Sequence, residues 1–352
     1  MIDNFFTFFL YNKYISLILI FVFFICCIFW NQIFTFFNLK KYKNFHRIHE
    51  GEIPRLGGFF IFTYLIVTTF YEFNINFFIK DLLISSIPFF LISLKEDLFH
   101  NTKPKIRLIS MIISSLIFFY IHPINFPIID MPYLDFILNN YYFSLIFYIF
   151  SILVLMNGMN LIDGLNGLFG LTAIFQLIAI IFIAHNLSDI DVVNLAFILL
   201  IPLLIFLVFN FPFGYIFAGD FGAYFYGFAI GLLTIYLFGR NSDLLSWSAV
   251  LFLFYPCMEL IFSFIRKVAN KINPLDADQN HLHTLLAKNF SKKINNKFSN
   301  PMATIFLFIF WLLPITLSLI IGNNLMLIIF SIFIFIFIYL FLYSLFMKGV
   351  NY

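Results

Sequence analysis

YISLILIFVFFICCIFWNQIFTFF, residues 14–37, contains no Asp, Glu, Lys or Arg. The hydrocarbon core of a bilayer is about 30 Å thick and needs roughly 20 apolar residues per helix, so this run is long enough to cross it. It is too long for the hydrophobic region of a signal peptide, and no small-residue cleavage site follows it. We therefore expect a retained first transmembrane helix.

Similar apolar runs recur along the chain. Of 352 residues, 62% are hydrophobic and only 11% charged, whereas a soluble domain has about 25% charged residues. This composition excludes a soluble globular protein, a disordered chain and a disulfide-rich secreted domain. Strand-like alternation is absent, which favours helices. We predict an all-α polytopic membrane protein, one domain over residues 1–352, with about eleven spans at 14–37, 57–73, 78–94, 106–122, 142–157, 164–185, 193–210, 221–238, 246–265, 302–321 and 324–346.

The basic residues predict the orientation of these spans. With eleven helices, 17 of the 20 Lys and Arg residues lie on one face, and only Lys13, Lys80 and Arg240 lie on the other. Cytoplasmic connections carry an excess of Lys and Arg. We expect a periplasmic N-terminus and a cytoplasmic C-terminus.

Polar residues gather in five segments of the predicted cytoplasmic face. Taken singly, each segment has a simple structural explanation, such as a basic loop holding lipid headgroups, a solvated helix end, a turn or an N-cap. Paired glycines at 57–58 favour close packing or the approach of a ligand to the backbone. The five segments are residues 46–58, 95–107, 157–167, 210–222 and 276–283.

Carboxylates and amides dominate three of these segments. Glu96 and Asp97 are adjacent, and Asp220 lies between glycines at the start of a span. Adjacent acids repel each other unless a cation offsets them, and Mg²⁺ takes one or two carboxylates together with substrate phosphates. Asn157, Asn160 and Asp163 follow each other at intervals of three, which predicts one helix face.

The long loop at 266–301 adds cationic groups. His281 and His283 are two residues apart and do not share a helix face, so a zinc helix is not indicated. These histidines and Arg266 can supply donors to a phosphate. Glu259 either pairs with a neighbouring helix or shapes the site. The residues alone thus predict Mg²⁺-assisted transfer of a phosphate-bearing group at the cytoplasmic interface, since a transporter places its polar groups near the midplane.

Six motifs in order resemble the polyprenyl-phosphate N-acetylhexosamine-1-phosphate transferases of glycosyltransferase family 4. They are HRIHEGEIPRLGG (46–58), KEDLFHNTKPKIR (95–107), NGMNLIDGLNG (157–167), NFPFGYIFAGDFG (210–222), PCMELIFSFIRK (256–267) and DADQNHLHTLL (276–286). The resemblance implies transfer of a sugar 1-phosphate from a UDP-N-acetyl sugar to undecaprenyl or another polyprenyl phosphate, with release of UMP. It implies Mg²⁺, with Mn²⁺ as the alternative, and a multi-pass protein of the bacterial inner membrane.

The resemblance also implies roles for individual residues. Asp97, Glu96 and Asp163 are the expected catalytic carboxylates, and Asp220 and Asn160 are the expected metal ligands. The residues expected to bind substrate are His46, Arg55, Lys105, Arg107, Asn157, Asn210, Arg266, His281 and His283.

This chain departs from the family pattern at three positions, where Glu96 and Asn166 replace acids of the Asp pair and the Asp-Gly-x-Asp-Gly motif and Thr284 replaces a third His. The DADQNHLHT segment resembles the GlcNAc-transferase branch, which favours O-antigen or another surface polysaccharide. The alternatives are a phospho-MurNAc-pentapeptide transferase and, in another class, a lipid-linked sugar transporter or an inactive scaffold. We expect no nucleic acid partner and consider a homodimer.

Overall fold

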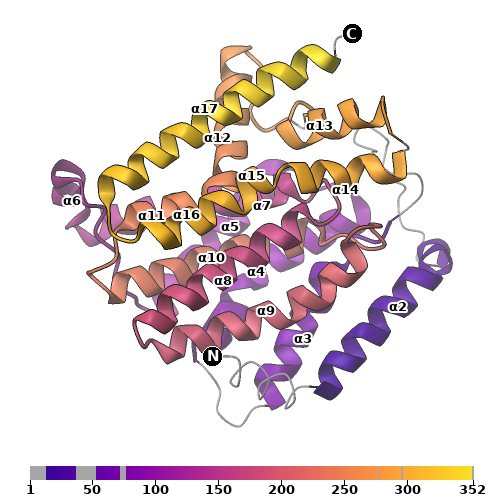
Figure 1. Cartoon of the computed structure of the whole chain (residues 1–352). Helices are drawn as coiled ribbons and strands as arrows, with labels where there is room; N and C mark the ends of the chain where they lie inside the picture. Colours follow the sequence, from indigo (N-terminus) through magenta and orange to yellow (C-terminus); the bar gives the residue numbers. More distant parts are fainter. Residues whose placement is uncertain (1–12, 37–52, 72–76, 277, 295, 351–352) are drawn as a thin grey trace.

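A computed structural model describes residues 13–36, 53–71, 77–276, 278–294 and 296–350, and this part of the chain contains helices and no strands. The predicted all-α class is therefore confirmed. In chain order the helices are α2 (Lys13–Phe36), α3 (Gly57–Tyr71), α4 (Phe77–Phe99), α5 (Pro104–Ile121), α6 (Pro132–Leu138), α7 (Tyr141–Ile162), α8 (Leu168–Asn186), α9 (Ile190–Asn210), α10 (Gly219–Arg240), α11 (Ser246–Phe252), α12 (Phe254–Ala269), α13 (Leu282–Ser291), α14 (Asn296–Phe306), α15 (Phe308–Trp311), α16 (Leu313–Ile321) and α17 (Leu325–Val350) (Figure 1).

Seven of these helices are long and apolar enough to cross a membrane, and the number rises to nine if each of two bent pairs is one span. Two shorter apolar helices, Lys13–Cys26 and Gly57–Thr69, are also described. Each predicted span overlaps one of these segments. The count of eleven and the orientation of the termini stay predictions.

Two spans predicted as single helices are bent. The 246–265 run divides into α11 and α12, which meet at 78°, and the 302–321 run bends by 43° after Phe306. Pro256 lies in the first turn of α12. Because proline has no backbone N–H, it cannot continue the hydrogen bonding of α11 into α12.

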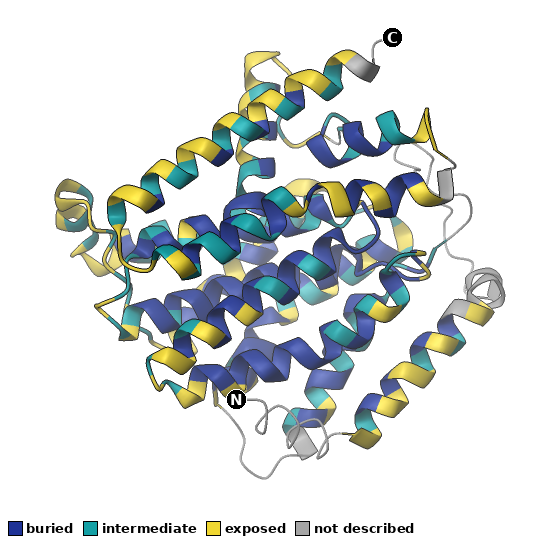
Figure 2. Ribbon diagram, viewed as in Figure 1, coloured by how far each residue is buried: buried dark blue, intermediate teal, exposed yellow. Residues whose placement is uncertain are grey.

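Helix α10 lies at the centre of the bundle, among α3, α4, α7 and α8 (Figure 1). Almost every residue from Gly219 to Phe238 is buried, as the dark blue centre of Figure 2 shows. At its beginning, α10 meets the start of α3 so closely that a Cβ on Gly58 would collide with the backbone of Gly222. The paired glycines at 57–58 therefore serve close packing.

Backbone hydrogen bonds join the beginnings of α3 and α10. The amide N–H groups of Gly57 and Gly58 donate to the carbonyls of Phe217 and Ala218 over 3.0 and 2.8 Å, and Phe217 N–H donates back to Pro54 over 2.9 Å. These bonds bring the 53–58 segment beside the start of α10, which is where the polar groups described next converge.

Candidate active site

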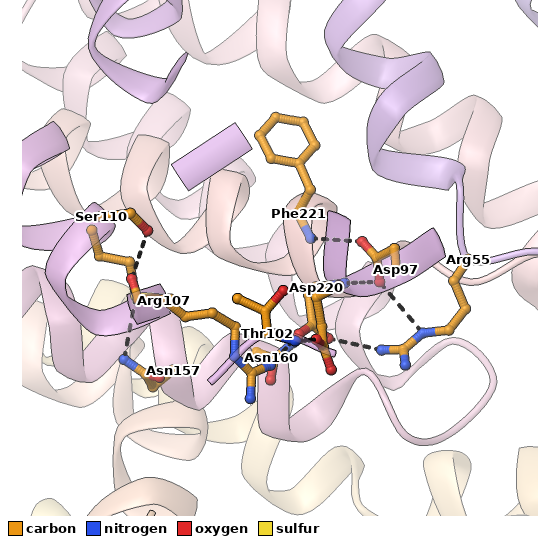
Figure 3. A network of polar contacts seen from close by, with 11 residues as sticks. Arg55, Asp97, Thr102, Arg107, Ser110, Asn157, Asn160, Asp220 and Phe221 are labelled. Atoms are coloured by element: carbon orange, nitrogen blue, oxygen red, sulfur yellow. Dashed lines mark hydrogen bonds and ion pairs between the residues drawn. The ribbon is translucent and has the colours of Figure 1, made fainter. Parts of the chain in front are cut away.

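The first turn of α10 is bound by a carboxylate from α4. Both oxygens of Asp97 accept backbone hydrogen bonds, from Asp220 N–H over 2.8 Å and from Phe221 N–H over 3.2 Å (Figure 3). The first N–H groups of a helix have no partner within the helix and carry partial positive charge. Asp97 therefore satisfies two of these donors and attaches the end of α4 to the beginning of α10.

Asp220 is the centre of the site, and three side chains donate to its carboxylate. Arg55 reaches one oxygen over 2.9 Å and Asn160 reaches the same oxygen over 3.1 Å, while Arg107 pairs with the other oxygen. The Nε of Arg55 also lies 3.6 Å from Asp97. The sequence segments around 55, 97, 107, 160 and 220 thus meet at one point, as Figure 3 shows.

The charges of the site are layered. The side chains of Asp97 and Asp220 are 2% and 6% exposed, whereas those of Arg55 and Arg107 are 29% and 21% exposed. The carboxylates lie beneath the guanidinium groups. The guanidinium group of arginine has a planar set of donors that matches phosphate oxygens. This arrangement therefore places phosphate-binding groups toward the solvent, with the carboxylates buried beneath them.

A third carboxylate, that of Asp163, also binds the start of α10. Asp163 follows the last residue of α7, and one of its oxygens accepts the N–H of Gly219 over 3.2 Å. Its other oxygen is buried without a partner among the described residues. Burial disfavours the charged form and raises the pKa of Asp163 to about 8, against the lowering effect of Arg55.

Gly219 is required at its position for two reasons. Its φ is 76°, and a Cβ there would lie 2.8 Å from a carboxylate oxygen of Asp97 and would also collide with the Arg55 carbonyl. Only glycine adopts this backbone conformation without strain and leaves room for both neighbours.

Several predicted site residues lie at the edge of this cluster or outside it. Asn157 donates to Leu153 within its own helix over 2.8 Å, so only Asn160 and Asp163 of the predicted three-residue face reach the cluster. Glu96 accepts the N–H of Thr102 over 2.7 Å, and Lys105 is exposed. His46 lies outside the described residues.

Asn210 is almost fully buried, and its side-chain amide forms hydrogen bonds with the backbone of two loops. Its oxygen accepts Gly167 N–H over 2.7 Å, and its nitrogen donates to the Ile216 carbonyl over 2.8 Å. Asn166 donates in the same way to the Pro212 carbonyl over 2.7 Å. These amides hold the loop before α10 against the loop after Asp163.

A second polar cluster surrounds Glu259 of α12. Its carboxylate accepts the hydroxyls of Tyr255 and Tyr339 over 3.1 and 2.9 Å and lies 3.1 Å from Nδ1 of His283. Nδ1 of His281 lies 3.6 Å from the Glu259 carboxylate, and the ring of His281 stacks on that of His283. From the sequence, Glu259 stayed open between two roles, and neither tyrosine was predicted. The four-residue spacing of Tyr255 and Glu259 was a usable signal, but Tyr339 is 80 residues away.

Arg266, at the end of α12, pairs with Asp278 and donates to Ser263 over 3.3 Å. Burial tends to raise the pKa of Asp278, but the backbone N–H of Asn280 and the Arg266 guanidinium lower it below its usual value. Arg266 therefore holds the loop that precedes the two histidines.

Oxygen atoms are the available donors for a metal at the first cluster. In the described parts of the chain, no three His, Cys, Asp or Glu side chains are arranged to hold a metal ion. The buried free oxygen of Asp163, the carboxylate of Asp220 and the amide of Asn160 form a set of the kind that suits Mg²⁺, which keeps waters and takes few protein ligands.

Two comparisons with known proteins give matches. Over 87 residues the chain is 32% identical to the undecaprenyl-phosphate alpha-N-acetylglucosaminyl 1-phosphate transferase of Thermotoga maritima, an alignment that spans 25% of this chain and 28% of that relative. Residues 80–238, which contain Asp97, Arg107, Asn160, Asp163 and Asp220, match the family model described as Glycosyl transferase family 4. Over this segment, which is 159 of the 352 residues, the chain is similar to glycosyl transferase family 4.

Proposed function

We propose that the protein transfers an N-acetylhexosamine 1-phosphate from a UDP-sugar to polyprenyl phosphate, giving polyprenyl-pyrophosphate-sugar and UMP. The observation that carries this proposal is the layered cluster at the start of α10, in which two guanidinium groups lie over the carboxylates of Asp97 and Asp220 and Asp163 binds the same helix terminus. The name of the Thermotoga maritima relative, a transferase that uses undecaprenyl phosphate, supports the same substrate classes.

In the proposed reaction, an oxygen of polyprenyl phosphate attacks the β-phosphorus of the UDP-sugar. The bond from that phosphorus to the bridging oxygen breaks, and UMP leaves with the electron pair. A phosphate monoester has its second pKa near 6 and is largely ionised at neutral pH, so the attacking group needs no dedicated base. Catalysis then consists of positioning and charge stabilisation.

Each residue of the cluster has a proposed part in this step. Arg55 and Arg107 bind and orient the phosphates, because their guanidinium groups are the exposed layer. Asp97 supports Asp220 through the first turn of α10. The predicted catalytic and substrate-binding roles that no observation tests stay predictions: the catalytic roles of Asp97, Glu96 and Asp163, and the substrate-binding roles of His46, Lys105, Asn157, Asn210, Arg266, His281 and His283.

Mg²⁺ is the proposed cofactor, with Mn²⁺ as the alternative. Asp220, Asp163 and Asn160 would hold it, since they offer oxygen donors and one of these oxygens is buried without a partner among the described residues. When bound, a divalent cation neutralises the charge of the pyrophosphate. The chain's own contribution is to hold these donors together beneath the two arginines.

The proposed location is the cytoplasmic face of the bacterial inner membrane, because most Lys and Arg residues fall on the face that carries the site. The proposed product begins O-antigen or another surface polysaccharide. A homodimer stays a prediction.

The proposal is tested with purified protein, UDP-GlcNAc labelled in the sugar, undecaprenyl phosphate and Mg²⁺. The wild type should form a labelled lipid and release UMP in equal amounts. Asp220→Asn should abolish both while the protein still inserts into membranes, and Asp243→Asn, an exposed acid outside the cluster, should keep full activity.

Other outcomes separate the alternatives. A labelled lipid formed only from UDP-MurNAc-pentapeptide would assign the chain to peptidoglycan synthesis. No lipid product from any UDP-sugar would favour a transporter or an inactive scaffold. Full activity of Asp220→Asn would refute the assignment of the site.

A further inference from the structure

Glu259 is a fully buried carboxylate outside the cluster at α10. Two neutral hydroxyls, from Tyr255 on its own helix and Tyr339 on α17, donate to its two oxygens. A buried charge is tolerated when hydrogen bonds satisfy it. The two tyrosines therefore hold Glu259 as an ionised acceptor at a defined point between α12 and α17.

The contact with His283 determines where the imidazole proton lies. An ionised carboxylate only accepts hydrogen bonds, so the Nδ1 that lies 3.1 Å from Glu259 must carry a proton. In a neutral imidazole the other nitrogen, Nε2, then has a free lone pair. Burial lowers the pKa of His283 below its usual value despite the nearby carboxylate, which favours this neutral form at pH 7.

Nε2 of His283 faces the first cluster. A Cβ built on Gly164 would lie 3.3 Å from this nitrogen, and Gly164 directly follows Asp163. The imidazole thus bridges the two clusters, with Nδ1 toward Glu259 and Nε2 toward the turn that carries Asp163. The stacked ring of His281 keeps the imidazole of His283 in this plane, with an angle of 10° between the rings.

We propose that Glu259 is a positioning residue that holds His283 as the Nδ1–H tautomer, so that Nε2 accepts a hydrogen bond from a hydroxyl of the nucleotide sugar beside Asp163. This inference rests on the proposed function, because the hydroxyl belongs to the proposed donor. Glu259 itself is buried and acts through His283. Tyr339 extends the same arrangement to the C-terminal helix.

The first test reads the tautomer directly and does not depend on activity. Full-length protein labelled with ¹⁵N-histidine is studied by NMR in detergent, and the His283 signals are identified by their loss in His283→Asn. In the wild type, Nε2 of His283 should have the chemical shift of an unprotonated nitrogen. In Glu259→Gln the two tautomers should mix. A protonated Nε2 in the wild type, or an unchanged spectrum in Glu259→Gln, would overturn the proposal.

The second test uses kinetics. Partners that orient metal-binding histidines are worth about 10- to 100-fold in activity, and by analogy Glu259→Gln should lower kcat/KM for the UDP-sugar by about this factor. Loss of the carboxylate also removes its stabilisation of the imidazolium, and the acid limb of the pH profile should move to lower pH. The titratable groups around the ring are Glu259 and Tyr255 on α12, Tyr339 on α17, His281, and Asp163 beyond Gly164.

Two tyrosines of α17 provide a matched pair. Tyr339→Phe removes a hydroxyl that donates to Glu259, whereas Tyr343→Phe removes one that is buried one turn later without a hydrogen bond among the described residues. Tyr339→Phe should lower kcat/KM severalfold and Tyr343→Phe should not. Equal effects of the two, or a lower activity of Glu259→Gln with an unmoved pH profile, would show a merely structural role. If the wild type forms no lipid product, the proposed function fails, and the NMR test still decides the tautomer.

Discussion

Replacing Asn166 with Asp should destabilise the protein in a pH-dependent way. The side chain of Asn166 is 2% exposed, and its amide nitrogen donates to the Pro212 carbonyl over 2.7 Å. Its amide oxygen is buried without a hydrogen bond among the described residues and lies against Gly214. An ionised Asp would place one carboxylate oxygen against a carbonyl oxygen and leave the other unpaired.

The size of the effect follows from proton binding. In its protonated form the introduced carboxyl group still donates to the Pro212 carbonyl. In the unfolded chain, however, an Asp loses its proton above a pKa of about 3.9. Because the folded state must keep this proton, each pH unit above that pKa destabilises it by about 1.4 kcal/mol. The free energy of unfolding should therefore fall as pH rises. The free energy of unfolding should be lower than in the wild type by about 2 kcal/mol at pH 5.5 and by at most about 5 kcal/mol at pH 7.5. The second value is an upper limit, because at that pH the folded protein can also ionise the introduced Asp and give up the hydrogen bond to Pro212.

Thermal unfolding in detergent, followed by intrinsic fluorescence, checks this expectation. The difference in midpoint between Asn166→Asp and the wild type should widen from pH 5.5 to pH 7.5. Asn101→Asp, at an exposed position, should show a small difference that does not change with pH. A variant as stable as the wild type at pH 7.5, or a difference that stays constant between the two pH values, would refute the reasoning.

Three further predictions address packing, charge and metal binding. Gly227→Ala should lower the free energy of unfolding by about 1–3 kcal/mol because its Cβ would meet the backbone of α7, whereas Gly231→Ala, four residues later with ordinary contacts, should be neutral or slightly stabilising in thermal unfolding. Arg107→Lys should lower kcat/KM of the transferase assay by about tenfold or more, since lysine cannot reproduce the planar donors beside Asp220. Because burial raises the pKa of Asp163 to about 8, Mg²⁺ binding at pH 7 should release a proton, measured by calorimetry in two buffers, and Asp163→Asn should abolish this release.

The fold class could be predicted because lipid leaves the chain few choices. An apolar run of about 20 residues must satisfy its own backbone in a helix, so hydropathy alone indicates where helices lie. Hydropathy does not indicate, however, where a helix axis changes direction. The 78° bend between α11 and α12 falls inside a continuous apolar run, and its signal was a single residue, Pro256, rather than any change in polarity.

The site was predictable where the chemistry is local. Asp97, Asp163 and Asp220 are acids at the ends of apolar runs, and acids in such places are costly unless they are used. Amides are less informative, because the same Asn side chain serves a ligand or a loop equally well. Asn210 was predicted to bind substrate, which stays a prediction, and both groups of its amide also bind loop backbone, a structural role that only the tertiary contacts reveal.

The beginning of α10 explains why so few charges suffice for the site. Its free N–H groups attract Asp97 from α4 and Asp163 from the end of α7, so one helix terminus orders acids that are far apart in sequence. Asp220 lies on that same first turn and thereby receives a fixed position between Arg55 and Arg107. At pH 7 the two arginines balance the charges of Asp97 and Asp220, because Asp163, whose pKa burial raises to about 8, is largely protonated. Removing any one of the acids should consequently disturb the other two, and substitutions within this group should be strongly non-additive.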